Sequence, residues 1–221
     1  MVIDSERLVA PVTAGAEVLE TIRGRRSIGK VRPECPPRAL IESVIEAGTW
    51  APNHRLTEPW RFIVLAGAAR RAFGSVLVAS HASKRPRAAG RDDAAALAEA
   101  RAAEAKVAMK PLRAPVVIAV AVEPAIGPKI DEAEELMAAA AAAQNMLLAA
   151  HALGLGAIWR TGDPVYDPAV KAFFGLEPSA HLLGFIYLGY PDGAPPQRQR
   201  TPAAQFTRWL GWDDTPPAET I

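Results

Sequence analysis

The stretch AGTWAPNHRLTEPWRF, residues 47–62, decides how the rest of the chain is read. It joins the end of an apolar helical pattern to the start of a strand, yet it carries two tryptophans, two prolines and an Asn-His pair. The prolines fix the backbone, and the indoles of Trp50 and Trp60 offer flat apolar walls. Asn53 and His54 add short hydrogen-bond donors. This connector therefore suits a planar heteroaromatic ring with polar edges, unless the tryptophans fill core and His54 only completes a turn.

Length and charge bound the class of protein. The chain has 221 residues, half of them hydrophobic, which predicts one compact domain over residues 1–221. With 25 basic and 24 acidic side chains the net charge is +1, so no whole-molecule field attracts nucleic acid or an anionic membrane. A small basic cluster at residues 84–87, with Arg91, is the one local argument for nucleic acid, and such clusters are typical of solvated loops. We predict neither a nucleic-acid nor a membrane partner.

The single cysteine, the uncharged run and the histidines bear on the cellular location, on a membrane span and on a metal site. Cys35 cannot form an internal disulfide and no leader pattern opens the chain, which predicts a cytoplasmic location. Residues 136–158 carry no formal charge, but Gln144 and Asn145 among many alanines favour a buried helix and strand over a membrane span. Four scattered histidines and one cysteine predict no metal site.

Hydrophobic periodicity predicts an α+β fold. Helical patterns occupy the first forty or so residues before any strand appears, and strands and helices then alternate unevenly, which argues against a regular Rossmann fold. Neither GxGxxG nor GxxxxGK[ST] is present. We expect helices at residues 17–23, from Pro37 to Gly48, at 69–79, from a capping box at Asp131 and Glu134 to Leu153, and at 167–174. We expect strands at residues 62–66, 115–122, 156–159 and 181–188.

Two segments differ from this core. Residues 80–112 are rich in alanine and charge and poor in large apolar groups, which predicts a loop, a solvated helix from about Asp92, and the mobility of a lid. Residues 190–221 are Pro-rich but carry Phe206, Trp209, Leu210 and Trp212. We expect this tail to dock on a surface, such as that of a second subunit.

Two further motifs could carry chemistry. Arg25, Arg26 and Ser27 follow a helix and suit a phosphate monoester, although arginine pairs at helix ends often only complement the helix dipole. The segment GLGAIWRTG, residues 154–162, combines glycines that permit close backbone approach with Arg160 and Thr161 where a strand ends. A Gly-rich turn of this kind is also a common structural joint.

Taken in order, these motifs resemble the FMN-dependent nitroreductase family, in particular its small single-domain NAD(P)H nitroreductases. The resemblance rests on the arginine pair with its serine, on APNHRLTEPWRF, on GLGAIWRTG and on LGYPDGAPPQRQR, and it covers about residues 17–210. It implies a homodimer with a central, mainly antiparallel sheet flanked by helices, and FMN at the subunit interface. It also implies the cofactor-binding residues. These are Arg25, Arg26 and Ser27 with Arg198 or Arg200 for the phosphate, and Trp50, Asn53, His54, Trp159, Arg160 and Thr161 toward the ring.

The resemblance further implies an oxidoreductase that takes hydride from NAD(P)H and reduces nitroaromatics, quinones or related electrophiles in a ping-pong cycle. FMN carries the hydride, so no catalytic side chain is predicted. Dehalogenation, dehydrogenation or flavin fragmentation on the same fold, or a flavin-binding module without catalysis, are the alternatives. The sequence leaves open the physiological acceptor and the choice between NADH and NADPH.

Two positions depart from the family pattern. Gly29 stands where many members have a basic residue, with Lys30 beside it, and Glu58 stands in the connector where many have glutamine. A carboxylate facing the flavin would disfavour the anionic reduced ring, so we expect Glu58 to face an arginine instead.

Overall fold

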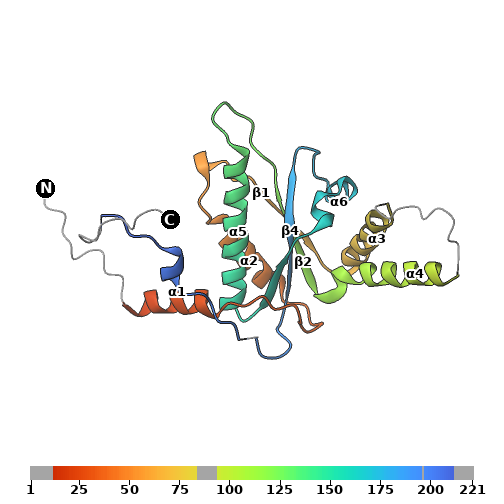
Figure 1. The fold of residues 1–221 in the computed structure, drawn as a ribbon, viewed down its shortest axis with the longest axis horizontal. Coiled ribbons are helices and arrows are strands. Elements are labelled where there is room, and N and C mark those ends of the chain that lie inside the picture. The colour runs from red at the N-terminus through yellow and green to blue at the C-terminus, as the bar shows by residue number, and fades with distance from the viewer. Residues whose placement is uncertain (1–11, 84–93, 196, 212–221) are drawn as a thin grey trace.

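The structure is a computed structural model that describes residues 12–83, 94–195 and 197–211. There a four-stranded sheet is covered by helices on both faces (Figure 1), so the fold is α+β, as predicted. The helices are α1 (Val12–Gly24), α2 (Arg38–Thr49), α3 (Gly67–Ser83), α4 (Ala94–Ala108), α5 (Glu132–Ala152) and α6 (Pro168–Phe173). The strands are β1 (Trp60–Leu65), β2 (Val116–Val122), β3 (Gly156–Arg160) and β4 (His181–Gly189). Short 3-10 turns occur at His54–Leu56, Lys110–Arg113, Asp163–Tyr166 and Ala203–Phe206.

The sheet has the strand order β1-β2-β4-β3, and every neighbouring pair is antiparallel. The expected antiparallel sheet is therefore confirmed. β1 and β3 form its two edges, three strand spacings apart, which is roughly 14 Å. Ser27 extends the sheet beyond β3 by a single parallel bridge to Ala157.

Strand β2 shows why the core has two halves. All seven of its residues are buried, as the unbroken apolar run predicts for a strand covered on both faces. Val117, Ala119 and Ala121 pack in the cluster with α3 and α6, whereas Val116, Ile118 and Val120 pack with α2 and α5. Figure 1 shows these two helical layers on opposite sides of the strands.

A bulge at Gly184 shapes the end of β3. The β2–β4 register slips there, since Val120 pairs with Gly184 but Ala121 pairs with Leu182. Gly184 has a φ of 146°, and a Cβ on it would lie 2.5 Å from both the Arg160 carbonyl oxygen and the Trp159 indole nitrogen. Only glycine fits at this position.

Two predicted helix ends are corrected. Gly48 does not end α2, because the helix continues to Thr49. A Cβ on Gly48 would lie 2.8 Å from Cγ of Met146, so this glycine permits close packing of α2 on α5. At the start of α5, Asp131 accepts from the Ala133 amide as a cap should, whereas the carboxylate of Glu134 lies 4.0 Å from His54.

The apolar face of α1 is not covered within one chain. Val18, Leu19 and Ile22 form the stripe that the sequence indicates, yet they are 59%, 49% and 49% exposed. Apolar side chains left open in a row along one helix mark an interaction surface.

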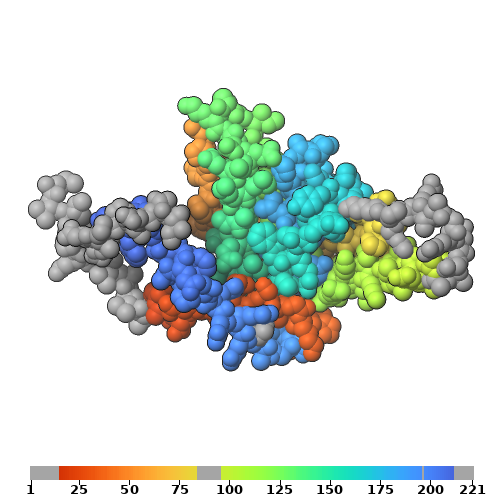
Figure 2. Space-filling model, in the orientation of Figure 1, coloured from red at the N-terminus to blue at the C-terminus, as the bar shows by residue number. Residues whose placement is uncertain are grey.

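Residues 80–112 and the tail are described in part. α3 extends to Ser83 and α4 begins at Ala94, so the predicted loop lies outside the described residues. Figure 2 shows α4 standing out from the rest of the molecule, and a lid function for it stays a prediction. In the tail Phe206, Trp209 and Leu210 are mostly exposed, and Trp212 lies outside the described residues. Among the described helices, α5 included, none is long and apolar enough to cross a membrane.

Candidate functional site

The arginine segment lies beside the outer edge of β3. Ser27 is exposed and bridges to Ala157, which places residues 25–27 along that edge. The guanidinium of Arg26 turns back to the carbonyls of Arg23 and Arg25, so this side chain complements the end of α1. Beside the same edge, Arg25 is half-buried and Ser27 is exposed.

Arg160 ends β3 and lies over the space that Gly29 leaves free. A Cβ on Gly29 would be 3.0 Å from Nη2 of Arg160. The Arg160 guanidinium carbon lies 5.5 Å from the centre of the Tyr187 ring. Its Nε is buried and has no hydrogen-bond partner within the part of the chain that the structure describes. A buried cationic donor without an acceptor is costly unless a ligand supplies one.

The cation closest to position 29 is Arg160 rather than the adjacent Lys30. Lys30 pairs with Asp192 at 2.8 Å on the surface, so its ammonium group is directed elsewhere. The guanidinium beside Gly29 is that of Arg160, which comes from a strand more than a hundred residues later.

Arg160 also lines a hollow of about 270 Å³, here called the β3 hollow. Its polar rim is made by Lys110, Arg113, Arg160 and Thr161, and its apolar wall by Phe73, Leu77, Pro164, Phe185 and Tyr187. No carboxylate within the described ranges forms an ion pair with these three cations. Burial raises the pKa of the Tyr187 phenol, while Arg160 and Arg113 act to lower it. The hollow therefore combines an aromatic wall with unbalanced positive charge.

Trp159 lies on the opposite face of the sheet from Arg160, because side chains alternate along a strand. It packs against the cluster formed by α2 and α5, and its buried indole N–H, close to Gly184, has no acceptor among the described residues. Arg160 lines the β3 hollow, whereas Trp159 is not among the residues that line it. Contact of Trp159 with the flavin stays a prediction.

The connector uses its polar groups internally. Asn53 accepts from the Glu58 amide at 3.1 Å, and its side-chain nitrogen donates to the Ala51 carbonyl at 3.4 Å. Arg55, Leu56 and Glu58 have φ values of 56°, 55° and 47°, the left-handed region that side chains other than glycine rarely adopt. Such strain persists only where the surroundings impose it.

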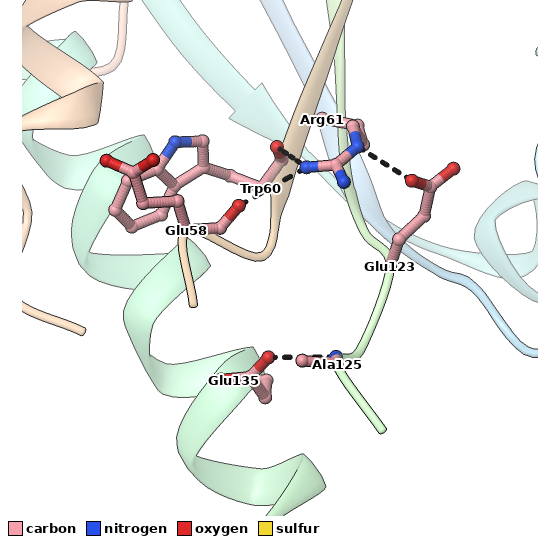
Figure 3. A network of polar contacts seen from close by, with 6 residues as sticks. All are labelled: Glu58, Trp60, Arg61, Glu123, Ala125 and Glu135. Carbon is pink, nitrogen blue, oxygen red and sulfur yellow. Dashed lines mark hydrogen bonds and ion pairs between the residues drawn. The ribbon is translucent and has the colours of Figure 1, made fainter. Parts of the chain in front are cut away.

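Glu135 anchors the connector at Thr57, the residue between the strained Leu56 and Glu58. This carboxylate on α5 is 1% exposed and accepts from the Thr57 hydroxyl at 2.6 Å. Its other oxygen accepts from the Ala125 amide at 3.2 Å, which Figure 3 shows. No local pattern indicates this role, since Glu135 is one of three acidic residues in the first turn of α5.

Glu58 does not face an arginine, contrary to expectation. Arg61 pairs with Glu123 at 2.7 Å and reaches only the main-chain carbonyl of Glu58, at 3.2 Å. Figure 3 shows the Glu58 carboxylate directed away from the Arg61 guanidinium. The positive φ of Glu58 turns its side chain outward, and it is exposed.

The two tryptophans of the connector separate. Trp60 is 6% exposed and fills core, which is the structural alternative for it, whereas Trp50 is 80% exposed. His54 is half exposed and lies near Glu134. Trp50 and His54 therefore remain available to a ligand or a second subunit.

The predicted site residues fall at opposite edges of the sheet. Arg25, Ser27, Arg160 and Thr161 gather at β3, whereas Trp50, Asn53 and His54 belong to the connector that leads into β1. Arg198 and Arg200 are exposed in the tail. No group of three potential metal ligands occurs in the described parts of the chain. One chain alone does not assemble the predicted set.

Sequence reasoning missed Lys110, Arg113 and Tyr187. Lys110 and Arg113 flank a short turn just before buried β2, and Tyr187 belongs to an apolar strand. Two basic residues just before a buried strand could have indicated a binding site at that end of the strand. Tyr187 had none, because its place beside Arg160 depends on the β3–β4 register.

Comparison with known proteins gives consistent matches. The model of the nitroreductase family matches residues 22–190. "Putative NAD(P)H nitroreductase YdjA" of Escherichia coli (strain K12) is 34% identical over 176 residues, covering 80% of this chain and 89% of that protein. YfhC of Bacillus subtilis (strain 168), which bears the same description, is 32% identical over 183 residues, with coverages of 83% and 89%.

Solved structures agree. A nitroreductase-like family protein from Bacillus cereus has a TM-score of 0.73 and 26% identity, covering 88% of this chain and 96% of that one. A nitroreductase with bound FMN from Bacteroides fragilis has a TM-score of 0.65 and 25% identity, with coverages of 88% and 99%. The resemblance drawn from the motifs is thereby confirmed, and this chain belongs to the nitroreductase family of oxidoreductases.

Proposed function

We propose that this protein is an FMN-dependent oxidoreductase that accepts electrons from NAD(P)H and passes them to nitroaromatics, quinones or related electrophiles. The observation that carries the proposal is the β3 hollow, in which three cations and Thr161 surround an aromatic wall without a counter-ion among the described residues. The names of relatives support it, since they include NAD(P)H nitroreductases and a structure with FMN.

The residues present fit FMN in three respects. Arg160 holds a buried Nε without an acceptor, which a ring edge could supply. Gly29 has no side chain, so the Arg160 guanidinium can lie there. Arg25, which is half-buried, and Ser27, which is exposed, lie beside β3, where they would hold the phosphate. Arg198 or Arg200 would add to that grip from the tail.

The protein's part in the chemistry is electrostatic and steric. FMN, when bound, supplies the two-electron transfer, and donor and acceptor would use the same pocket in turn. Arg160, with Lys110 and Arg113 nearby, would offset negative charge on the reduced ring. The apolar wall of the hollow would keep water away from it.

We propose that two copies of the chain complete the site. The connector and the β3 hollow lie at opposite edges of the sheet, so Trp50, Asn53 and His54 would reach the ring held by the other copy. The open stripe on α1 and the exposed aromatics of the tail would be covered in such a homodimer. Sedimentation of the purified protein tests this, and a monomer at micromolar concentration would count against it. The cytoplasmic location also remains a prediction.

The catalytic proposal is tested on the purified, flavin-loaded protein without oxygen. Adding NADH or NADPH should bleach the flavin absorption, and adding a nitroaromatic or a quinone should restore it. A protein that gains no flavin from excess FMN would overturn the proposal. Bleaching that only other acceptors reverse would favour dehalogenation or another reaction on the same fold.

A further inference from the structure

A second basic hollow lies next to the β3 hollow and shares Arg113 with it. This arginine hollow, about 320 Å³ in volume, is rimmed by Arg32, Arg70, Arg71 and Arg113. Its other lining residues are uncharged: Val31, Pro33, Leu112, Ala114 and Pro115. The four arginines come from three separate segments, namely the loop after the arginine motif, the start of α3 and the turn before β2. Folding thus gathers positive charge that the sequence disperses.

The charge is poorly balanced within the protein. In the portion of the chain that the structure describes, the one ion pair made by these arginines is Arg32 to Glu34, at 3.6 Å. Arginines elsewhere are better matched, since Arg38 pairs with Glu42 and Arg61 with Glu123, each at 2.7 Å. With a net charge of +1 over 221 residues, four arginines at one hollow are a local concentration rather than a general excess.

The position of Arg70 and Arg71 at the start of α3 makes their unbalanced positive charge more unfavourable. Both lie within the first five residues of α3, and the first turn of that helix contains no acidic residue. The amino end of a helix carries partial positive charge, so cations there are unfavourable and anions are favoured. An anion in the arginine hollow would relieve both effects.

Arg70 is held ready for such an anion. One of its terminal nitrogens, Nη1, donates to the Ala114 carbonyl at 2.6 Å, which fixes the guanidinium. Its Nε is buried and has no acceptor among the described residues. A guanidinium tied at one nitrogen and unsatisfied at another can offer a paired set of donors to a phosphate group.

We propose that the arginine hollow binds a phosphate group of the nicotinamide dinucleotide. The identity of the ligand rests on the proposed function, whereas the need for an anion does not. Arg113 lines both hollows, so a dinucleotide whose nicotinamide reaches the β3 hollow could place a phosphate group beside the arginines of the adjacent hollow. Either the pyrophosphate or the 2′-phosphate of NADPH would provide the required chemistry.

Calorimetry with 2′,5′-ADP on the flavin-loaded protein tests the site without turnover. We expect 2′,5′-ADP to bind and adenosine to bind far more weakly. Arg70→Gln should weaken 2′,5′-ADP binding about 10- to 100-fold, as for loss of a charge-assisted hydrogen bond. Arg38→Gln removes the same charge from the exposed start of α2 and should leave binding unchanged. Melting temperatures establish that both variants are folded.

Reduction of the flavin by each dinucleotide then identifies the phosphate. A larger rise in apparent Kd for NADPH than for NADH on Arg70→Gln would assign the 2′-phosphate, and equal rises would assign the pyrophosphate. The inference is overturned if Arg70→Gln binds 2′,5′-ADP as the wild type does, or if only inorganic phosphate shows Arg70-dependent binding. Wild-type protein that binds 2′,5′-ADP through Arg70 but is not bleached by NAD(P)H would instead contradict the proposed function.

Discussion

The connector at residues 47–62 and the β3 hollow treat their polar groups in opposite ways. In the connector, Asn53 and Thr57 bond to main chain or to buried Glu135, and three strained residues are held in place. In the β3 hollow, Arg160 keeps a buried donor without a partner, and the three cations form no ion pair with a carboxylate among the described residues. The hydrogen bonds of the connector hold its own backbone in place, whereas the β3 hollow leaves donors unpaired that a ligand could satisfy. Mutations should therefore affect stability in one region and binding in the other.

The largest effect is expected at the anchor of the connector. Glu135→Ala removes a fully buried side chain, leaves Thr57 and the Ala125 amide unpaired, and should lower the free energy of unfolding by about 3 kcal/mol. Urea denaturation measures this. Glu134→Gln, at the exposed neighbouring residue, is the matched control and should change stability by less than about 0.5 kcal/mol. Similar losses for the two variants would show that the connector does not depend on Glu135.

The reverse pattern is expected for Arg160. Arg160→Gln should change the free energy of unfolding by no more than about 0.5 kcal/mol, because this half-buried guanidinium forms no ion pair and its Nε has no hydrogen-bond partner among the described residues. The same variant should weaken FMN binding about 10- to 100-fold and lower the reduction potential of the flavin. Fluorescence titration and spectroelectrochemistry provide the two readouts. A large stability loss with unchanged FMN affinity would place Arg160 in the scaffold instead.

Trp50 sharpens the comparison, because it belongs to the connector but is 80% exposed. Trp50→Ala should leave the unfolding of the single chain almost unchanged. If a second copy covers this indole, the dissociation constant of the dimer should rise about tenfold, as for a moderate interface hot spot. Sedimentation velocity over a range of concentrations checks this. An unchanged dissociation constant would remove Trp50 from the proposed interface.

The smallest effect concerns the wall of the β3 hollow. Burial raises the pKa of Tyr187 above its value of 10.0 in the unfolded chain, so the folded protein keeps that proton longer as pH rises. The Tyr187 contribution to stability is thus complete below about pH 10 and is lost as pH rises toward the folded pKa, at no more than about 1.4 kcal/mol per pH unit. Comparing urea denaturation of the wild type and Tyr187→Phe between about pH 8 and pH 11 isolates it. Parallel curves would contradict the prediction.

The sequence predicted the fold well where burial alone determines structure. The run at residues 115–122 became fully buried β2, and Asp131 caps α5 as expected, because both patterns depend on near neighbours. It failed at Gly48, where a glycine that looks like a helix end serves close packing of α2 on α5. The role of a residue that acts through contacts distant in sequence is not indicated by its local sequence pattern.

In the candidate site, too, residues in local motifs could be predicted, whereas residues brought in by distant contacts could not. Arg160 and Thr161 stand out in a short motif, and the structure brings them to the hollow. Lys110 and Tyr187 join them only through the order of strands in the sheet, and Glu135 acts on the connector from a helix some 80 residues later. The proposed roles of Arg25, Trp50 and the tail arginines depend on a ligand and a second copy rather than on contacts within one chain.

The bulge at Gly184 also bears on how this enzyme could be re-engineered. The carbonyl of Arg160 and the indole of Trp159 occupy the space that a Cβ on Gly184 would need. The path of the chain at the end of β3 therefore depends on a glycine in the neighbouring strand β4. Transplanting the segment that ends in Arg160 into a related scaffold would therefore carry its geometry across only if the bulged strand travelled with it. A saturation library at position 184 should return glycine alone, whereas positions on the surrounding loops would tolerate diversity.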